Sequence, residues 1–531
     1  MRALGWTALR LAWLRRLAPG CGAAGFAASI LLAPGQGAIA SISTTAKETY
    51  RFRGVQAPQV KTNPLVRELE QRLTQLRDQW RERSERVTLA AAIDQSLLHN
   101  PELAQAFAQI QQGQWNLIAV RRQWYPSVTA LAGAPAGGLL GYRSSSSRSS
   151  RSSEAATEIV KNSTTVEGLV PVLRLDWTFF DPSRGPQINA ASESVRSQEL
   201  LFDVAARNLV LQTQLAYFNL QEQEQLIRSY EEILSATTAQ VVQAEALFNV
   251  GNASLADVEQ IRTQQYQTLS LLIATYLGLI DAAASLARAM ALPPGQLVLP
   301  DDELGLYGQW NMPLKATIQQ AQALREEIQS SLAQSSSANW RASALLNRYW
   351  PRFSLVANGS YAYNDTDINN RQGGLSLSDS VRSSSWDGAV GLGFNWMLFD
   401  GGIAAAEAQA NRALERQFSD QAAVQRLQIS QDVEISYATY QASRLALLSS
   451  QAQVTSARQA AAAVRERFNV GYADTTSVVQ TLSQAIAAAN AYARSQREYN
   501  SAIASLYRAS AQWPLGTLAL RDQRVMQLKQ R

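Results

Sequence analysis

The chain has 531 residues with 48 basic and 43 acidic side chains, a formal net charge of +5, one cysteine and one histidine. With one thiol and one imidazole, a disulfide framework and a Cys/His metal site are both excluded. Nucleic acid is not implied as a partner, because four of the basic residues are arginines within the first 40 residues.

The first 40 residues have the pattern of an export signal peptide. Four arginines lead to an apolar stretch, Cys21–Ala33, and to the small-residue cleavage site Ala38-Ile39-Ala40. The pair Arg15-Arg16 leaves twin-arginine export as an alternative. Cleavage after Ala40 lowers the formal charge to +1 and removes the only cysteine. No later stretch looks apolar for long enough to cross a membrane as a helix, so we expect a periplasmic, secreted or outer-membrane β-barrel protein.

Residues 41–87 form a polar linker followed by an amphipathic helix. Apolar side chains recur at alternating steps of three and four between Leu65 and Val87, which is heptad spacing. Two interpretations remain open. The helix lies on the body of the protein, or it forms a short self-associating coiled coil.

A first structural unit follows at about residues 88–300. Helices are predicted over Thr88–Gln123 with a break at Asn100-Pro101, where asparagine caps the second helix and proline takes its first position. Strands are predicted at about 124–132 and 169–180, separated by a Gly- and Ser-rich loop, 133–168. The second strand alternates apolar and polar residues, which indicates a surface between apolar and wet surroundings.

The strand leads into an unusually long helical hairpin. Asp181-Pro182 has the pattern of a helix start, and no helix breaker occurs between Gln187 and Gly251. About 65 residues at roughly 1.5 Å each give a helix of about 100 Å, which suits a rod or a tube. The returning helix is predicted over 254–291.

The whole unit then recurs at about 301–516, before a short tail at 517–531. Phe248-Asn249-Val250-Gly251 reappears as Phe468-Asn469-Val470-Gly471, and Phe180-Asp181 as Phe399-Asp400. The second copy therefore has strands at about 350–363 and 388–399, a polar loop over 364–387, and a hairpin tip at 468–476 that matches the first tip at 248–254. The chain is a tandem duplication of a unit too long for a solenoid repeat.

The predicted strands have the length of tilted outer-membrane strands, with aromatic residues at the ends next to the helices. Four strands cannot close a barrel, and an open sheet edge is not tolerated in lipid. Several subunits are therefore expected to pool their strands. The predicted fold class is mostly α with a transmembrane β-barrel.

In this ordered set of motifs the chain resembles the TolC-type outer-membrane efflux and secretion channels over about residues 88–516. The resemblance implies a homotrimer with a 12-stranded β-barrel on a long periplasmic α-barrel. It implies a passive exit duct that meets a periplasmic adaptor protein and an inner-membrane pump. The cargo would be small toxic molecules or, in a type I secretion system, proteins.

The resemblance also assigns roles to residues of the two tips. It places adaptor docking at Val250-Gly251-Asn252 and at Val470-Gly471-Tyr472. It places the pore constriction at Asp257, Gln260, Phe468, Ala473, Ser477 and Gln480. Among these positions only Asp257 keeps a carboxylate of the family's polar lock, so we expect helix packing, including Phe468, to hold the closed tip.

The sequence shows no catalytic constellation, cofactor motif or metal site, and the protein is not expected to be an enzyme. The carboxylate pairs Glu326-Glu327 and Glu231-Glu232 sit on predicted helices, where neighbouring residues point apart, and are expected to be solvated. His99 is expected at the surface before a helix cap. Two alternatives to a conduit remain, a non-conducting tether to the outer membrane and a soluble periplasmic adaptor.

Overall fold

The computed structural model describes residues 64–132, 140–153, 156–372, 375–514 and 517–530, which belong to one structural unit, residues 59–531. The expected signal peptide and the linker over 41–63 lie outside the described residues. In chain order, the elements are α1 (Pro64–Glu82), β1 (Ser84–Val87), α2 (Leu89–His99), α3 (Pro101–Arg122), β2 (Ser127–Ala132), β3 (Leu140–Ser153), β4 (Ala156–Leu169), β5 (Pro171–Phe180), α4 (Arg184–Asn249), α5 (Leu255–Ala289), β6 (Leu297–Pro300), α6 (Leu314–Leu324), α7 (Glu326–Leu346), η1 (Asn347–Tyr349), β7 (Arg352–Gln372), β8 (Leu375–Asn395), α8 (Ile403–Asn469), α9 (Thr475–Ala509) and α10 (Thr517–Gln530).

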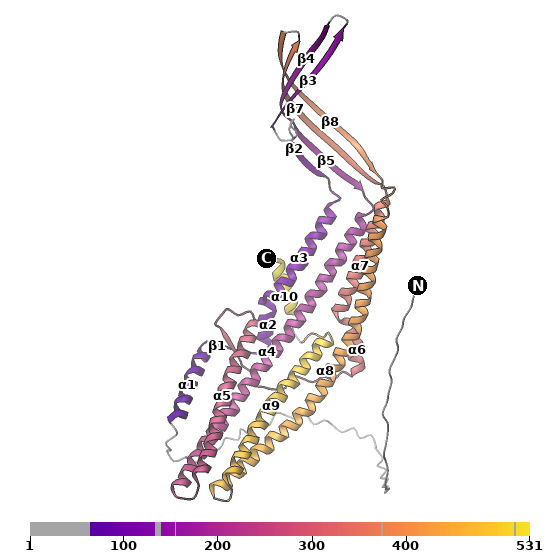
Figure 1. Ribbon diagram of the computed structural model, residues 1–531. Helices are drawn as coiled ribbons and strands as arrows, with labels where there is room; N and C mark the ends of the chain where they lie inside the picture. The colour runs from indigo at the N-terminus through magenta and orange to yellow at the C-terminus, as the bar shows by residue number, and fades with distance from the viewer. Residues whose placement is uncertain (1–63, 133–139, 154–155, 373–374, 515–516, 531) are drawn as a thin grey trace, which may run out of the picture. The chain divides into compact units, whose positions relative to one another are not determined.

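Two long helical hairpins, α4 with α5 and α8 with α9, dominate the fold (Figure 1). Helix α4 has 66 residues and α8 has 67, so each is about 100 Å long at roughly 1.5 Å per residue. The two hairpins pack against each other through α4 and α9. The fold class expected from the sequence, mostly helical with long hairpins and paired antiparallel strands, is confirmed.

Short polar motifs precede helices α3 and α4, and helix α4 begins later than predicted. As expected, Pro101 opens α3, and the Asn100 side chain accepts a hydrogen bond from the Glu102 backbone N–H at 2.8 Å. Helix α4 instead begins after Ser183, because the Asp181 carboxylate accepts the Ser183 backbone N–H at 3.0 Å and so forms a turn before the first helical residue.

One antiparallel sheet contains the remaining long strands. Strands β2, β5, β7 and β8 pair side by side next to the helices, whereas β3, β4, β7 and β8 pair further out. The polar loops expected over 133–168 and 364–387 are wrong where the structure describes them. These segments are rich in serine, threonine and asparagine, but their backbones pair residue by residue, so they form β3, β4 and the outer halves of β7 and β8. Conversely, β8 ends at Asn395, so Trp396 and Leu398 lie beyond the strand.

The helix expected over 65–87 ends at Glu82. Residues 84–87 instead form β1, which pairs in parallel with β6, the strand that links the two repeats. Helix α1 lies on the body of its own chain, where Leu69 and Leu73 pack against a buried cluster of α4 and α5.

Helix α5 differs from the expectation that no stretch after residue 40 is apolar for long enough to cross a membrane as a helix. It is the one helix among the described residues that is long and apolar enough, by length and composition alone, to cross a membrane. It packs against α4 along the hairpin, and Ile261, Leu269 and Leu286 are buried there.

Candidate functional site

The first hairpin tip ends α4 with a glycine in the left-handed region. Gly251 has φ of +81°, and its N–H donates to the Phe248 carbonyl at 3.0 Å. The N–H of Asn252 donates to the Leu247 carbonyl at 2.8 Å. This pair of bonds is a Schellman motif, which satisfies the last free carbonyls of the helix and needs a residue that tolerates positive φ.

The second tip repeats this geometry. Gly471 also has φ of +81° and donates to the Phe468 carbonyl at 3.1 Å, while the Tyr472 N–H donates to the Arg467 carbonyl at 2.8 Å. The matching sequence motifs therefore build the same turn.

The helices that leave the tips each begin with one serine and one aspartate, at the cap and three residues later, and the order of the two is reversed between the hairpins. On the first hairpin, Ser254 caps α5, and the Asp257 carboxylate accepts the Ser254 backbone N–H at 2.9 Å and its hydroxyl at 2.7 Å. On the second, Asp474 is the cap and accepts hydrogen bonds from the backbone N–H and hydroxyl of Ser477. Each hairpin thus carries one carboxylate at its tip.

These two carboxylates are neighbours across the hairpins. The Ser254 hydroxyl and backbone N–H lower the pKa of Asp257, and the Thr475 hydroxyl of the other hairpin adds to this effect. The Ser477 hydroxyl lowers the pKa of Asp474, and the negative charge of Asp257 opposes that shift. Both groups are therefore charged at neutral pH. The sequence interpretation treated Asp474 only as a helix cap, although its place three residues after the tip glycine matches Ser254.

The predicted constriction residues fall into three environments. Gln260 and Gln480 are exposed, whereas Asp257 and Ser477 are engaged in the caps. Ala473 is half-buried beside the apolar cluster between the hairpins. Phe468 is only 5% exposed in that cluster, where it contacts residues of both hairpins. A phenylalanine buried there packs the two hairpins of the chain together.

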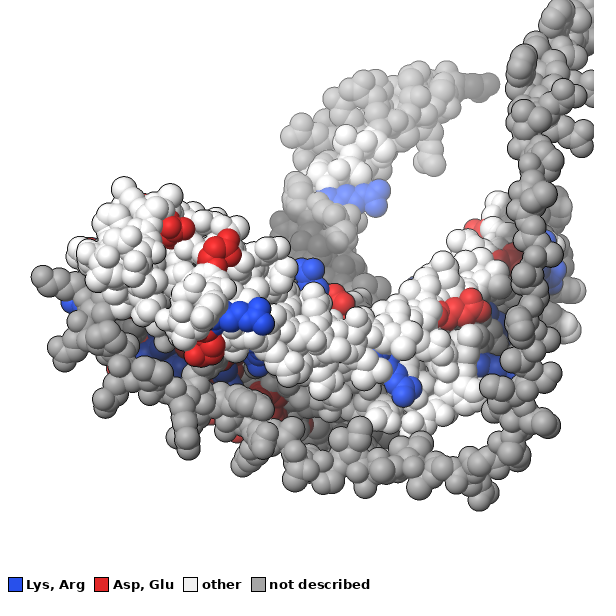
Figure 2. All heavy atoms as spheres, turned by 90° about the horizontal axis from the view of Figure 1, so that it is seen from below, with Lys and Arg blue, Asp and Glu red and all other residues white. Residues whose placement is uncertain are grey.

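The predicted docking residues lie at the surface. Val250 is 69% exposed, Val470 67% and Tyr472 86%, and Asn252 is exposed as well. Seen from the tip end, the described surface is mostly uncharged, with some acidic and basic side chains distributed over it (Figure 2). The same view shows the described residues as a curved wall that is hollowed on one side.

At the other end, the sheet carries an apolar band between two aromatic borders. A central row of paired residues, Val128, Leu175, Ala357 and Val390, lies within it. The lower border includes Phe353 and Phe394, with ring centroids 5.3 Å apart, and the upper border is Tyr361 with Trp386, 4.8 Å apart. Eight residues at about 3.3 Å each separate the borders, roughly 26 Å, which matches the apolar band of an outer-membrane barrel.

The sequence interpretation missed the upper border, because Trp386 fell in a predicted loop. Beyond it the same face turns polar, and Asp365 forms an ion pair with Arg382 at 2.8 Å. The alternating pattern of Val390 and Leu392 extends back to Trp386 and was the available signal.

One carboxylate pair departs from the expectation of a solvated face. Glu326 binds Arg207 at 2.7 Å, and Glu327 binds Arg325 at 2.8 Å and Arg508 at 2.6 Å, all within the packed helices. Burial would raise the pKa of Glu327, but the two guanidinium groups lower it to about 2. These ion pairs join α7 to α4 and α9.

Two further observations concern His99 and possible metal ligands. His99 is exposed at the end of α2. Within the residues that the structure describes, no group of three His, Cys, Asp or Glu side chains is placed to hold a metal ion.

Comparison with known proteins gives a consistent result. The family described as "Outer membrane efflux protein" matches residues 92–292 and 317–512, once in each repeat. No curated protein matches the sequence. Among solved structures, the CmeC outer membrane channel of Campylobacter jejuni aligns with a TM-score of 0.62 at 15% identity, covering 82% of this chain and 89% of that one. VceC from Vibrio cholerae aligns with a TM-score of 0.58 at 16% identity, covering 80% of this chain and 96% of that one. The MtrE outer membrane channel of Neisseria gonorrhoeae aligns with a TM-score of 0.57 at 16% identity, covering 80% of this chain and 89% of that one. At these identities the structures establish the fold.

Proposed function

Because the chain belongs to the outer membrane efflux protein family, and is therefore an outer-membrane efflux channel of the TolC type with a periplasmic helical extension, we propose that it works as a homotrimer in a tripartite pump. The family consists of transporters, so the protein is not an enzyme. Membership of a family of efflux channels also disfavours the two alternatives, a non-conducting tether and a soluble periplasmic adaptor.

The incomplete sheet is the observation that supports the proposed trimer. Strands β2 and β8 end the inner sheet on either side, and each has an unpaired edge within the described chain. An edge exposed to lipid would leave backbone groups without partners, so the strands must be completed by other copies. Four strand positions per subunit make twelve in a trimer, enough for a closed barrel around a lumen.

Helix α8 supports the same proposal. Twenty-four of the 66 residues of α4 are buried, but only eleven of the 67 residues of α8. Large apolar side chains on α8 are exposed in the single chain, namely Val424, Leu427, Ile435, Leu445 and Leu448. A neighbouring subunit would cover this face and complete the helical tube.

The tips supply the partner-binding surface in this proposal. The exposed Val250 and Val470 flank turns of identical backbone geometry, so three subunits would offer six similar docking points to a periplasmic adaptor. The adaptor would connect the channel to an inner-membrane pump, and a type I secretion system would use the same surface. Inside the tip, Asp257 with Asp474, Gln260 and Gln480 are the proposed constriction.

Cross-linking and electrophysiology test the proposal together. Cysteine pairs across the β2 and β8 edges should yield trimers in the outer-membrane fraction, since residues 41–531 contain no cysteine that would compete. The same trimers should conduct in planar bilayers. Monomers, or trimers without conductance, would contradict the proposed duct.

A further inference from the structure

Helix α1 lies outside the segments that match the family, which begin at residue 92. Two anchors fix it to the body. At its start Val66 is fully buried. After its end, β1 pairs with β6, and the Arg86 guanidinium donates to the Pro300 carbonyl at 3.0 Å. The helix is thus held across α4 and α5 at both ends.

Between these anchors the packing leaves a cavity of about 120 Å³. Its walls are apolar and come from three sources: α1, the α4/α5 hairpin and β6. The apolar lining includes Leu73, Leu76, Trp80, Ile227, Tyr276 and Leu279. Benzene fits an apolar cavity of about 150 Å³, so a space of similar size suits a small ring or a short alkyl chain.

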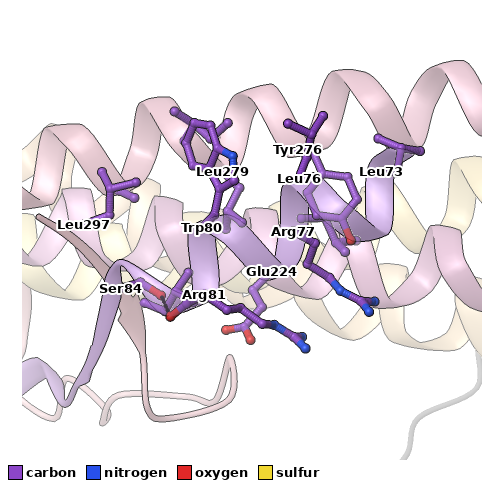
Figure 3. Close-up of a pocket in the computed structure, with 14 residues that line it drawn as sticks. Leu73, Leu76, Arg77, Trp80, Arg81, Ser84, Glu224, Tyr276, Leu279 and Leu297 are labelled. Carbon is purple, nitrogen blue, oxygen red and sulfur yellow. Dashed lines mark hydrogen bonds between the residues drawn. The ribbon is translucent and has the colours of Figure 1, made fainter. Parts of the chain in front are cut away.

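One side of the cavity is polar. In Figure 3, Arg77, Arg81 and Glu224 lie together on one side, opposite Trp80 and Leu279. The mouth is open to solvent, because Leu76 in its lining is 51% exposed. A ligand can therefore place an apolar part inside while its polar end stays at the rim.

The charges at the rim select the sign of that polar end. Glu224 is paired with Arg86 at 3.4 Å and with Arg228 at 3.2 Å, and Arg228 also binds Glu303 at 2.8 Å. Arg77 is paired with Glu231 at 3.4 Å and with Asp78 at 3.3 Å. Arg81 is exposed, and no carboxylate of the described chain lies within ion-pair distance of it. Arg81 is therefore a rim guanidinium without a carboxylate partner in the described chain, and its planar group binds carboxylate or phosphate well.

We propose that the cavity between α1 and the α4/α5 hairpin binds a small anionic amphiphile, with its alkyl or aryl part against Trp80 and Leu279 and its anionic head on Arg81. The site is on the helical hairpin, separate from the tips and from the barrel. It gives the segment before the family match a ligand-binding role that does not depend on the proposed docking or pore residues.

Single-cysteine protection tests this site. The Leu76→Cys variant, in outer-membrane vesicles, is labelled with a maleimide in the presence of octanoate, octanol or octylammonium. Octanoate should slow labelling at least fivefold, while octanol and octylammonium should have little effect. Leu324→Cys is the matched control, because Leu324 is 47% exposed on a different helix and should not be protected.

Two second-site changes separate the head and tail contributions. Arg81→Gln in the Leu76→Cys background should abolish protection by octanoate, and Leu279→Trp, which fills the cavity, should do the same while export continues. Equal protection by octanoate and octylammonium would overturn the proposal, as would full protection after Arg81→Gln. A Leu76→Cys site that is unreactive without any probe would also overturn it, because another part of the chain would then occupy the cavity.

Discussion

The two hairpin tips share one backbone turn but bury different side chains. Phe248 and Phe468 occupy the same position three residues before the tip glycine. Phe468 is 5% exposed between the hairpins, whereas Phe248 is 43% exposed. The difference shows that a local motif sets the turn, while the position of each helix in the subunit decides which face of the turn is covered.

The largest effect should come from breaking the turn itself. Proline at position 471 cannot adopt φ of +81° and lacks the N–H that donates to the Phe468 carbonyl. Gly471→Pro should abolish export while subunits still assemble, and Gly251→Pro should do the same if the tips are equivalent. Gly471→Asn is the control, since asparagine tolerates the left-handed region. Drug accumulation and native electrophoresis measure the two properties, and loss of assembly would show that the turn serves folding.

The two phenylalanines should differ strongly on truncation. Phe468→Ala leaves a cavity between the hairpins and should cost about 3–5 kcal/mol of local stability, which would appear as a higher resting conductance. Phe248→Ala removes an exposed side chain and should change stability by less than about 0.5 kcal/mol. If Phe248→Ala instead reduces export at normal stability, the exposed ring belongs to the docking surface.

Acid should expose a second difference between the repeats. The residues at equivalent positions differ: Glu102 is exposed, whereas Glu327 is half-buried and forms ion pairs with Arg325 and Arg508. Because the folded-state pKa of Glu327 is lowered to about 2, its stabilising effect is present above its unfolded pKa of about 4.5 and is lost as pH falls toward 2. The loss amounts to about 3 kcal/mol. Thermal unfolding between pH 6 and 2 should show this loss in the wild type and in Glu102→Gln, but a flatter profile in Glu327→Gln.

The strands of the two repeats should respond alike to a charge. Leu175 and Val390 lie in the same row at the centre of the apolar band. An arginine facing lipid there costs roughly 2–4 kcal/mol, so Leu175→Arg and Val390→Arg should both reduce the amount of channel in the outer membrane. Ser360→Arg, on the opposite face beside Asp387, is the control and should insert normally. Equal tolerance of all three would mean that the band does not face lipid.

The smallest effect is expected at the carboxylates of the tips. Asp257→Asn and Asp474→Asn each remove one of two neighbouring charges, so each should lower cation preference by about twofold or less. Reversal potentials under a salt gradient measure this preference. If neither substitution changes it, the caps do not face the lumen, and both carboxylates serve only to begin their helices.

Local patterns predicted the parts of this fold that depend on local chemistry. The tip glycines, the Asn100 cap and the long helices follow from residues within a few positions of one another. The burial of Glu327 could not be predicted, because its partner Arg508 is distant in the sequence and only packing brings the two together. The outer strands could not be predicted because they too depend on distant residues. Their serine and arginine content is typical of a loop, and only their pairing with neighbouring strands makes them part of the sheet.

Those outer strands set where cargo leaves the protein. Strand β7 continues for eleven residues beyond Tyr361 and remains paired with β8 to Gln372, a rise of about 36 Å at roughly 3.3 Å per residue. A polar wall of that height would release its contents into water, well away from the acyl chains of the outer leaflet. An expelled hydrophobic compound would then have to diffuse back through water before it could partition into the membrane again.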